Sequence, residues 1–299
     1  VEHARLGFHV LSRLRWEGGD WKDAQRSTMR AEFVSRASDE QQRAIATAEA
    51  ARCLAMLERD LDQAEALLLE AESLSGRVGI ETTAIPTARG MLHLHRGELD
   101  PAATRFAEAR TLARREGDRT DEFQALEHLI MIEIERDDFA TAETLCTELL
   151  EIANRLREGS EAPFARALAA LSSYGSGREE AAPALEEALA QLRLADAKHR
   201  LAYALNRIAE VELAQGKVEA ALARSGEARR IADALVSPSE TVLATLGLAR
   251  AARAIDDAEM YKRYLEVLAA MPREHASAHA RRLVDGFLAE QQADEVLKA

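Results

Sequence analysis

Apolar residues recur along most of the chain at the three- and four-residue spacing that puts them on one face of a helix. Around the turn at 97–100, Ala102, Phe106 and Ala109 form an i, i+4, i+7 stripe, and Gly90 would let the preceding helix press close. No window of five to eight residues is rich in β-branched and aromatic residues and bounded by turns. The pattern therefore predicts an all-α chain of paired helices.

This helix–turn–helix pattern occurs seven times at an even spacing. The core residues that open the second helix of each unit are Ala24, Ala64, Ala102, Ala142, Ala182, Ala221 and Tyr261, between 38 and 40 residues apart. Such a period is typical of a repeat array. We expect one array over 1–299, with units at about 1–38, 39–78, 79–117, 118–158, 159–196, 197–236 and 237–272 and a capping helix at 273–292.

Helix boundaries follow from the same alignment. The first helices are expected at about 2–17, 40–58, 82–96, 120–136, 161–174, 199–215 and 240–254. The second helices are expected at about 21–37, 61–77, 100–116, 139–158, 179–196, 218–236 and 258–270, and the last helix at about 274–291. Residues that can cap helix N-termini stand at Ser38-Asp39, Asp60, Thr82-Thr83, Ser160 and Ser239. Glycines that can end second helices are Gly79, Gly117 and Gly159.

The spacing of small and large residues in these units resembles the tetratricopeptide repeat. The third unit matches at Gly90, Gly97, Leu99, Ala102, Phe106 and Ala109. The sixth matches at Ala209, Gly216, Val218, Ala221 and Ala228, with Ser225 at the large apolar position. The unit at 178–189 departs most, with Glu179 as the turn residue and Glu186 at the large position.

The period is about 40 residues, whereas a standard tetratricopeptide unit has roughly 34. Long units of this kind resemble the sensor domains of bacterial signal-transduction ATPases similar to the maltose regulator of the LuxR family, and also the peptide-binding arrays of Gram-positive quorum-sensing regulators. The resemblance implies a right-handed superhelical α-solenoid of about seven helix pairs with a C-terminal capping helix.

Charge and composition narrow the partners. The formal net charge is −13, and the clusters Arg114-Arg115 and Arg229-Arg230 lie among acids. Such a chain is repelled by a phosphate backbone, so no direct nucleic-acid partner is expected. The sequence has no run of 18 apolar residues and no signal pattern, so neither a membrane segment nor export is expected.

Cys53 and Cys146 lie apart in apolar helices, which favours free thiols in a cytoplasmic protein. The start at Val1 suggests a segment of a longer protein.

Catalytic and cofactor motifs are weak. Gly216-Lys217 has Val211 where a P-loop needs its first glycine, so no nucleotide site is expected. His275 and His279, four apart, would share a helix face, but without a third ligand they are better interpreted as a solvent-facing pair than as a metal site. The pairs at 137–138 and 256–257 are expected to cap helices. We expect neither enzyme activity nor a cofactor.

What remains is a binding surface. In the repeats that this chain resembles, the second, fifth, ninth, twelfth and thirteenth positions of each unit line the concave groove. The residues predicted to contact a ligand or partner there are His9, Arg13, Trp16, Glu49, Met91, His95, Glu127, Met131, Tyr174, Tyr203, Asn206, Glu210, Arg250 and Arg253. The same positions also hold Glu17, Cys53, Met56, Thr87, Leu94, Gln124, Glu135, Phe164 and Leu171.

Rings and methionines beside hydrogen-bonding groups suit a protein, a peptide or a small molecule such as an oligosaccharide. Arg250 and Arg253 would form a carboxylate clamp. The alternative for each ring or methionine is packing between adjacent units. The sequence favours a non-catalytic binding array, the sensor segment of a larger bacterial transcriptional or signalling regulator that also contacts that protein's other domains. The alternative is a stand-alone adaptor, scaffold or peptide receptor of the quorum-sensing type.

Overall fold

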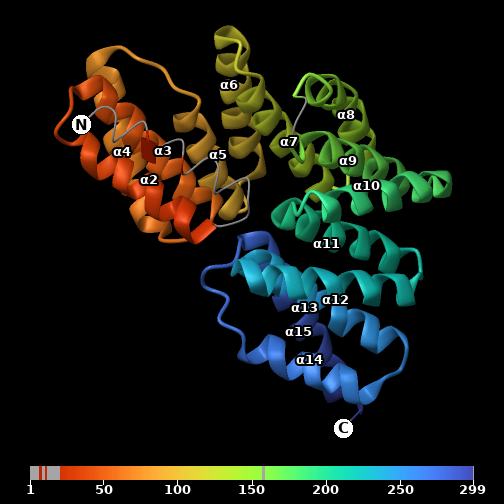
Figure 1. The fold of residues 1–299 in the computed structure, drawn as a ribbon. Coiled ribbons are helices and arrows are strands. Elements are labelled where there is room, and N and C mark those ends of the chain that lie inside the picture. Colours follow the sequence, from red (N-terminus) through yellow and green to blue (C-terminus); the bar gives the residue numbers. More distant parts are fainter. Residues whose placement is uncertain (1–6, 9–10, 12–20, 157–158, 299) are drawn as a thin grey trace.

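The computed structural model describes residues 7–8, 11, 21–156 and 159–298, and these form an all-α solenoid (Figure 1). The helices are α2 (Trp21–Ser35), α3 (Glu40–Met56), α4 (Leu61–Val78), α5 (Ala84–His95), α6 (Leu99–Glu116), α7 (Arg119–Glu135), α8 (Phe139–Ala153), α9 (Glu161–Gly175), α10 (Ala182–Leu194), α11 (Lys198–Ala214), α12 (Val218–Leu235), α13 (Pro238–Ala254), α14 (Ala258–Ala270) and α15 (Ala278–Lys298). Helices α3 to α14 pack as successive pairs, as predicted. The first helix predicted for unit one, 2–17, falls mostly outside the described residues.

The predicted stripe of the third unit is its core. Ala102, Phe106 and Ala109 are all at most 1% exposed. A Cβ placed on Gly90 would meet the Phe106 ring at 3.0 Å, so the absence of a side chain there lets α5 and α6 approach. The largest core cluster runs from α7 to α13 and includes the free buried thiol of Cys146.

The turn inside each described pair has at least one residue in the left-handed region. Equivalent residues, two after the end of each first helix, are Glu58, Gly97, Asp137, Gly177, Gly216 and Asp256. Glycine adopts this conformation without strain and aspartate tolerates it, whereas glutamate rarely does. Glu58 (φ 52°) is therefore the unusual member of the set.

The predicted N-cap positions at Asp39, Asp60, Thr83 and Ser160 are confirmed, whereas Ser239 is wrong because α13 begins at Pro238 after Ser237. Asp39, Asp138 and Asp257 accept backbone N–H bonds as caps, but Asp60 adopts a left-handed conformation (φ 46°) and makes no side-chain cap bond. At three other predicted sites the side chain makes no cap bond because its hydroxyl bonds to another unit instead. Thr83 bonds to Asp121, Ser160 to Arg200 and Ser239 to Glu58.

In the fifth unit the structure departs from the predicted helix over 179–196. A 3₁₀ turn, η1 (Glu179–Ala181), precedes α10. Glu186 is exposed, and the neighbouring Leu185 is buried at 1% exposure in its place. The core register is therefore shifted by one residue from the alignment, because a buried glutamate without a partner would be costly.

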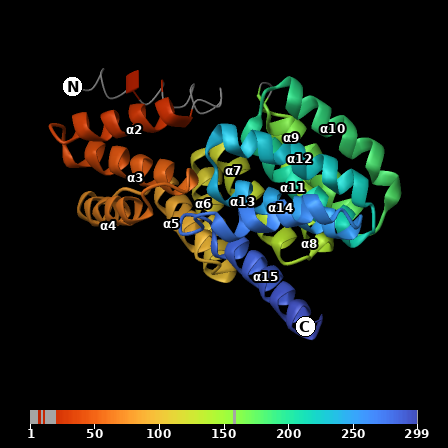
Figure 2. The ribbon, with the colours of Figure 1, turned by 90° about the horizontal axis from the view of Figure 1, so that it is seen from below.

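The last helix begins at Ala278, four residues later than predicted. Ser277 accepts the Ala280 N–H at 3.3 Å and caps the helix there. His275 therefore precedes α15 and shares no helix face with His279, which corrects the predicted pair. His275 is exposed, whereas His279 is turned inward against Arg207. Figure 2 shows α15 projecting from the body towards its C-terminal end.

The solenoid curls until its second unit touches the sixth and seventh. Arg59 Nη2, after α3, donates to the Leu235 carbonyl oxygen at the end of α12, at 3.1 Å. Leu57 and Cys53 pack against Leu235 and the partly buried Ile231. In Figure 1 the orange N-terminal helices accordingly face the blue C-terminal ones. This closure encloses the inner surface of the array.

Candidate functional site

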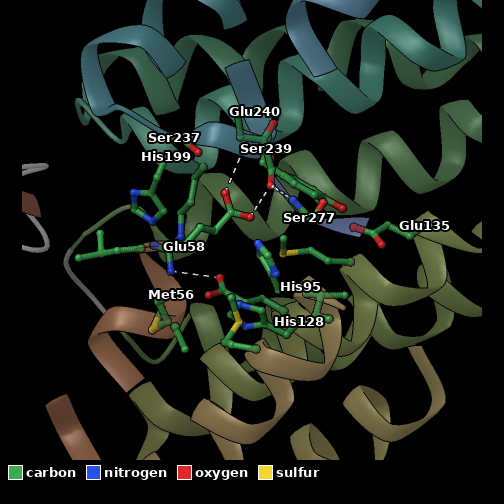
Figure 3. Close-up of a pocket in the computed structure, with 18 of the residues that line it drawn as sticks. Met56, Glu58, His95, His128, Glu135, His199, Ser237, Ser239, Glu240 and Ser277 are labelled. Carbon is green, nitrogen blue, oxygen red and sulfur yellow. Dashed lines mark hydrogen bonds and ion pairs between the residues drawn. The ribbon is translucent and has the colours of Figure 1, made fainter. Parts of the chain in front are cut away.

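A cavity of about 170 Å³ lies on the inner surface, where the two ends of the array meet. Its walls are the C-terminal end of α3, the facing sides of α5, α7, α9 and α11, the start of α13 and Ser277 before α15 (Figure 3). A cavity of roughly 150 Å³ holds a benzene ring. The space therefore suits a small molecule rather than a folded segment.

The cavity collects part of the predicted groove. Of the residues predicted to contact a ligand, Met91, His95, Glu127, Met131 and Tyr203 line it. From the wider set at groove positions, the lining includes Met56, Leu94, Gln124, Glu135 and Phe164.

Three other predicted residues do not line the cavity, but they hydrogen-bond to lining residues or to neighbours of these. Asn206 Nδ2 donates to Glu240 at 2.6 Å. Glu210 accepts from Arg207 at 2.8 Å. Glu49 accepts from Arg52, which also contacts Gln124 at 3.5 Å.

Three more predicted residues, all described, lie away from the cavity. Tyr174 is buried at 3% exposure, and its hydroxyl accepts from Lys217 Nζ at 2.9 Å. Arg250 and Arg253 lie over the Phe287 ring of α15, at 5.9 and 5.1 Å from its centre. His9, Arg13 and Trp16 fall outside the described residues.

Arg200 ties three helices together at one end of the cavity. Its guanidinium donates to Glu127 of α7 at 3.1 Å and to Glu161 of α9 at 2.9 Å. It lies 5.3 Å from the centres of both the Phe123 and Phe164 rings. At 9% exposure it is a buried cation that needs those carboxylates to offset its desolvation.

Arg207 has the same role at the other end. It donates to Glu210 and lies 3.7 Å from Glu135 of α7. It also donates to His279 Nε2 of α15 at 3.2 Å, which requires that nitrogen to be unprotonated. Burial and the nearby Arg207 charge lower the pKa of His279 to about 4, so the imidazole is neutral at pH 7.

Glu58 closes the cavity from the first described units. Its carboxylate accepts the Ser239 backbone N–H at 3.1 Å and the Ser239 hydroxyl, and Figure 3 shows it reaching towards Ser239. Ser239 Oγ in turn accepts the Ser277 N–H at 2.8 Å. The left-handed backbone of Glu58, costing roughly 1–2 kcal/mol, is retained where this side chain makes the contact.

The carboxyl groups of the cavity are short of cations. Glu58, Glu127, Glu135 and Glu240 line it, against the guanidinium groups of Arg200 and Arg207. Burial raises the pKa of all four carboxyl groups, and that of Glu135 reaches about 7. Burial also lowers the pKa of His199 to about 3, so it supplies no charge at neutral pH. The lining is therefore electronegative wherever these carboxyls are ionised.

Four enclosed polar atoms of the lining residues have no hydrogen-bond partner within the described part of the chain. They are the hydroxyl of Tyr203, a residue only 5% exposed, Glu135 Oε2, Arg200 Nε and Arg207 Nε. Buried polar atoms are nearly always paired, so unpaired atoms at a cavity suggest a place for an additional group.

No cluster of three or more His, Cys, Asp or Glu among the described residues is placed to hold a metal ion. Burial raises the pKa of Cys53 to about 11 and of Cys146 to about 12, so neither is a thiolate nucleophile at neutral pH. No described helix has both the length and the apolar character to cross a bilayer.

Sequence reasoning missed four of the six charged lining residues: Glu58, Arg200, Arg207 and Glu240. Arg200, Tyr203 and Arg207 recur at i, i+3, i+7 on α11, a spacing that predicts one shared face. The predicted groove positions included only Tyr203 of these three. Glu58, Ser239 and Ser277 come together only through the closure of the superhelix, which no local spacing reveals.

Similarity to solved structures supports the same fold. A signal-transduction ATPase with numerous domains and a tetratricopeptide-repeat sensor, from Pyrococcus horikoshii, superposes with a TM-score of 0.55 at 16% identity, covering 100% of this chain and 44% of that one. The apo form of RapI gives 0.55 at 11% identity, covering 97% and 86%. A tetratricopeptide repeat protein from Parabacteroides merdae gives 0.52 at 14% identity, covering 95% and 98%.

No family model and no curated protein sequence matches the chain. The solved structures establish the architecture. The chain is a tetratricopeptide-like repeat array, and it spans less than half the length of the ATPase.

Proposed function

We propose that this chain is a non-catalytic sensor array whose inner cavity binds a small molecule and whose two ends close around it. The observation that carries the proposal is the cavity itself, formed jointly by α3, α5, α7, α9, α11 and α13. A ligand in contact with the first and last of these helices favours the closed superhelix over any more open one, and so shifts the population between them.

The ends of the array are suited to such a response. Each repeat in a solenoid contacts mainly its neighbours, so small rotations accumulate along the array. The contacts between Glu58 and Ser239 and between Arg59 and Leu235 join units that are far apart in the array. We propose that the change in curvature is transmitted to other domains of a larger regulator, in keeping with the similarity to an ATPase that carries a repeat sensor.

A second candidate is a peptide or protein adaptor. This candidate is supported by a general property of repeat proteins, whose concave surfaces bind extended partners. The small volume of the cavity and the contact between the two ends of the array favour the small-molecule function instead.

Native mass spectrometry of the chain with a library of small polar molecules tests the proposal. We expect a displaceable mass on the wild type that is lost in Met131→Trp, because the indole would fill the cavity. Leu194→Trp is the matched control, since Leu194 is 89% exposed and distant from the lining. A bound mass that survives Met131→Trp, in a variant that melts like the wild type, would place binding outside the cavity.

A further inference from the structure

The lining of the cavity carries more negative than positive groups at short range. Glu127 shares Arg200 with Glu161, which accepts from the same guanidinium at 2.9 Å. Glu135 shares Arg207 with Glu210. Each of the two lining arginines is thus already divided between two carboxylates.

Among the described residues, no arginine or lysine donates to the other two lining carboxyls. Glu240 accepts from the Asn206 amide, and Glu58 accepts from Ser239. Amide and hydroxyl donors orient a carboxylate but do not neutralise it. Two further described cations lie outside the lining. Arg282 is exposed on α15, although its charge still acts on Glu135, and Arg52 is paired with Glu49 and Asp121.

An independent observation comes from Tyr203. Its ring packs edge-on against Phe164 at 6.2 Å, and Arg207 lies 5.4 Å above its centre. Its hydroxyl, enclosed and without a partner, is a vacant acceptor and donor among the charges of Glu135, Glu240 and Arg207. A ligand donor placed here would satisfy both this oxygen and Glu135 Oε2.

From these observations, and resting on the proposed function of the cavity, we infer that its ligand is a small organic cation whose ammonium or guanidinium group is held by Glu135, Glu240 and the Tyr203 hydroxyl. The apolar part of the ligand lies against Met91, Met131 and Leu94. Multiple N–H donors satisfy several acceptors at once, and the positive charge offsets the surplus of carboxylates. The absence of a metal-holding cluster among the described side chains favours an organic cation over a metal ion.

Three probes of nearly equal size and different charge test the inference: benzylammonium, benzyl alcohol and benzoate. Isothermal titration calorimetry of the chain at pH 8, where Glu135 with its pKa of about 7 is mostly ionised and benzylammonium keeps its charge, would measure each at constant ionic strength set with potassium chloride. We expect benzylammonium to bind about tenfold or more tightly than benzyl alcohol, equivalent to roughly 1.4 kcal/mol, and benzoate to bind most weakly.

Two charge-removing variants locate the effect. Glu135→Gln and Glu240→Gln should each weaken benzylammonium binding about tenfold and leave benzyl alcohol within about twofold of the wild type. The matched control is Glu219→Gln, which removes one charge at an exposed position of α12 and should change neither. A melting curve for each variant verifies that it is folded at the titration temperature.

The outcomes separate the two proposals. If benzyl alcohol or benzoate binds as tightly as benzylammonium and Met131→Trp abolishes that binding, the cation inference is wrong and the cavity remains a ligand site. If none of the three probes binds up to its solubility limit, both proposals are wrong. If benzylammonium binds equally well to Glu135→Gln, Glu240→Gln and Glu219→Gln, the contact is unspecific charge attraction and the inference is wrong.

Discussion

Glu58 and Ser239 are separated by 181 residues in sequence, and two hydrogen bonds join them across the mouth of the superhelix. Glu58 lies in the turn after α3, and Ser239 lies in the first turn of α13. Because Ser239 also accepts the Ser277 N–H, the contact links three parts of the chain. Closure of the array thus combines these polar contacts with the apolar packing of Cys53 and Leu57 against Leu235.

The substitution Ser239→Ala should loosen this closure. It removes one donor to Glu58 and the acceptor of the Ser277 N–H, so partly buried polar atoms lose partners at roughly 1–3 kcal/mol. We expect faster amide hydrogen exchange at 57–60 and 235–239, with the exchange of α8 and α9 unchanged. Ser73→Ala, at an exposed serine within α4, is the control. Equal exchange in both variants would contradict a role for Ser239 in closure.

Gly90→Ala should destabilise the third unit. The added Cβ meets the Phe106 ring at 3.0 Å, and overpacking of this kind costs about 1–3 kcal/mol. Gly76→Ala, in α4, meets nothing within 4 Å and should instead stabilise the chain by about 0.5–1 kcal/mol through helix propensity. Urea unfolding measures both free energies. Phe106→Leu in the Gly90→Ala background should recover part of the loss, and no recovery would point to another cause.

Glu135 should make the stability of the fold pH-dependent. Its pKa in the folded chain is about 7, above the ordinary 4.5, so the folded state keeps a proton that the unfolded chain has lost. The contribution of Glu135 therefore favours folding below about pH 4.5 and is lost as the pH rises through about 7. The unfolding free energy lost over this pH range is about 3 kcal/mol.

The measurement is the difference in unfolding free energy between wild type and Glu135→Gln at a series of pH values. This difference cancels the opposing effect of His279, whose lowered pKa makes low pH unfavourable. We expect the unfolding free energy of Glu135→Gln, relative to that of the wild type, to increase from pH 5 to pH 8. A difference that stays flat over this range would mean that Glu135 is ionised throughout.

Arg200→Met should be among the most destabilising single changes at the site. It leaves Glu127, 6% exposed, without its cation, and breaking a buried pair in this way costs about 3–5 kcal/mol. Adding Glu127→Gln should recover a large part of the lost stability, because the unpaired buried charge is then removed. Thermal unfolding of the two variants measures the recovery, and a double variant as unstable as Arg200→Met would show that ring stacking, not charge, is the main contribution of Arg200.

The fold could be predicted from the sequence because each helix pair is specified locally. The stripe at Ala102, Phe106 and Ala109 and the small residue at Gly90 determine how α5 and α6 pack, whatever the rest of the chain does. Where the sequence signal weakens, at Glu186, the predicted core register is displaced by one residue.

The site could be predicted only in part. Met91, Glu127 and Tyr203 could be placed on the inner face by their position within a unit. The cavity, however, depends on curvature accumulated over several units, so Glu58 and Ser239 gave no local signal of their contact. Thr83, Ser160 and Ser239 were predicted as caps because the same hydroxyls suit both local and long-range bonds.

The central claim, that a small molecule in the cavity holds the two ends together, is tested most directly by a distance across the closure. Spin labels at Gln63→Cys and Ala234→Cys would lie on exposed positions near the turn after α3 and the end of α12. With saturating benzylammonium, pulsed electron resonance should give one narrow, short distance, and without it a broader distribution extending to longer distances. Identical distributions with and without bound benzylammonium would contradict the account.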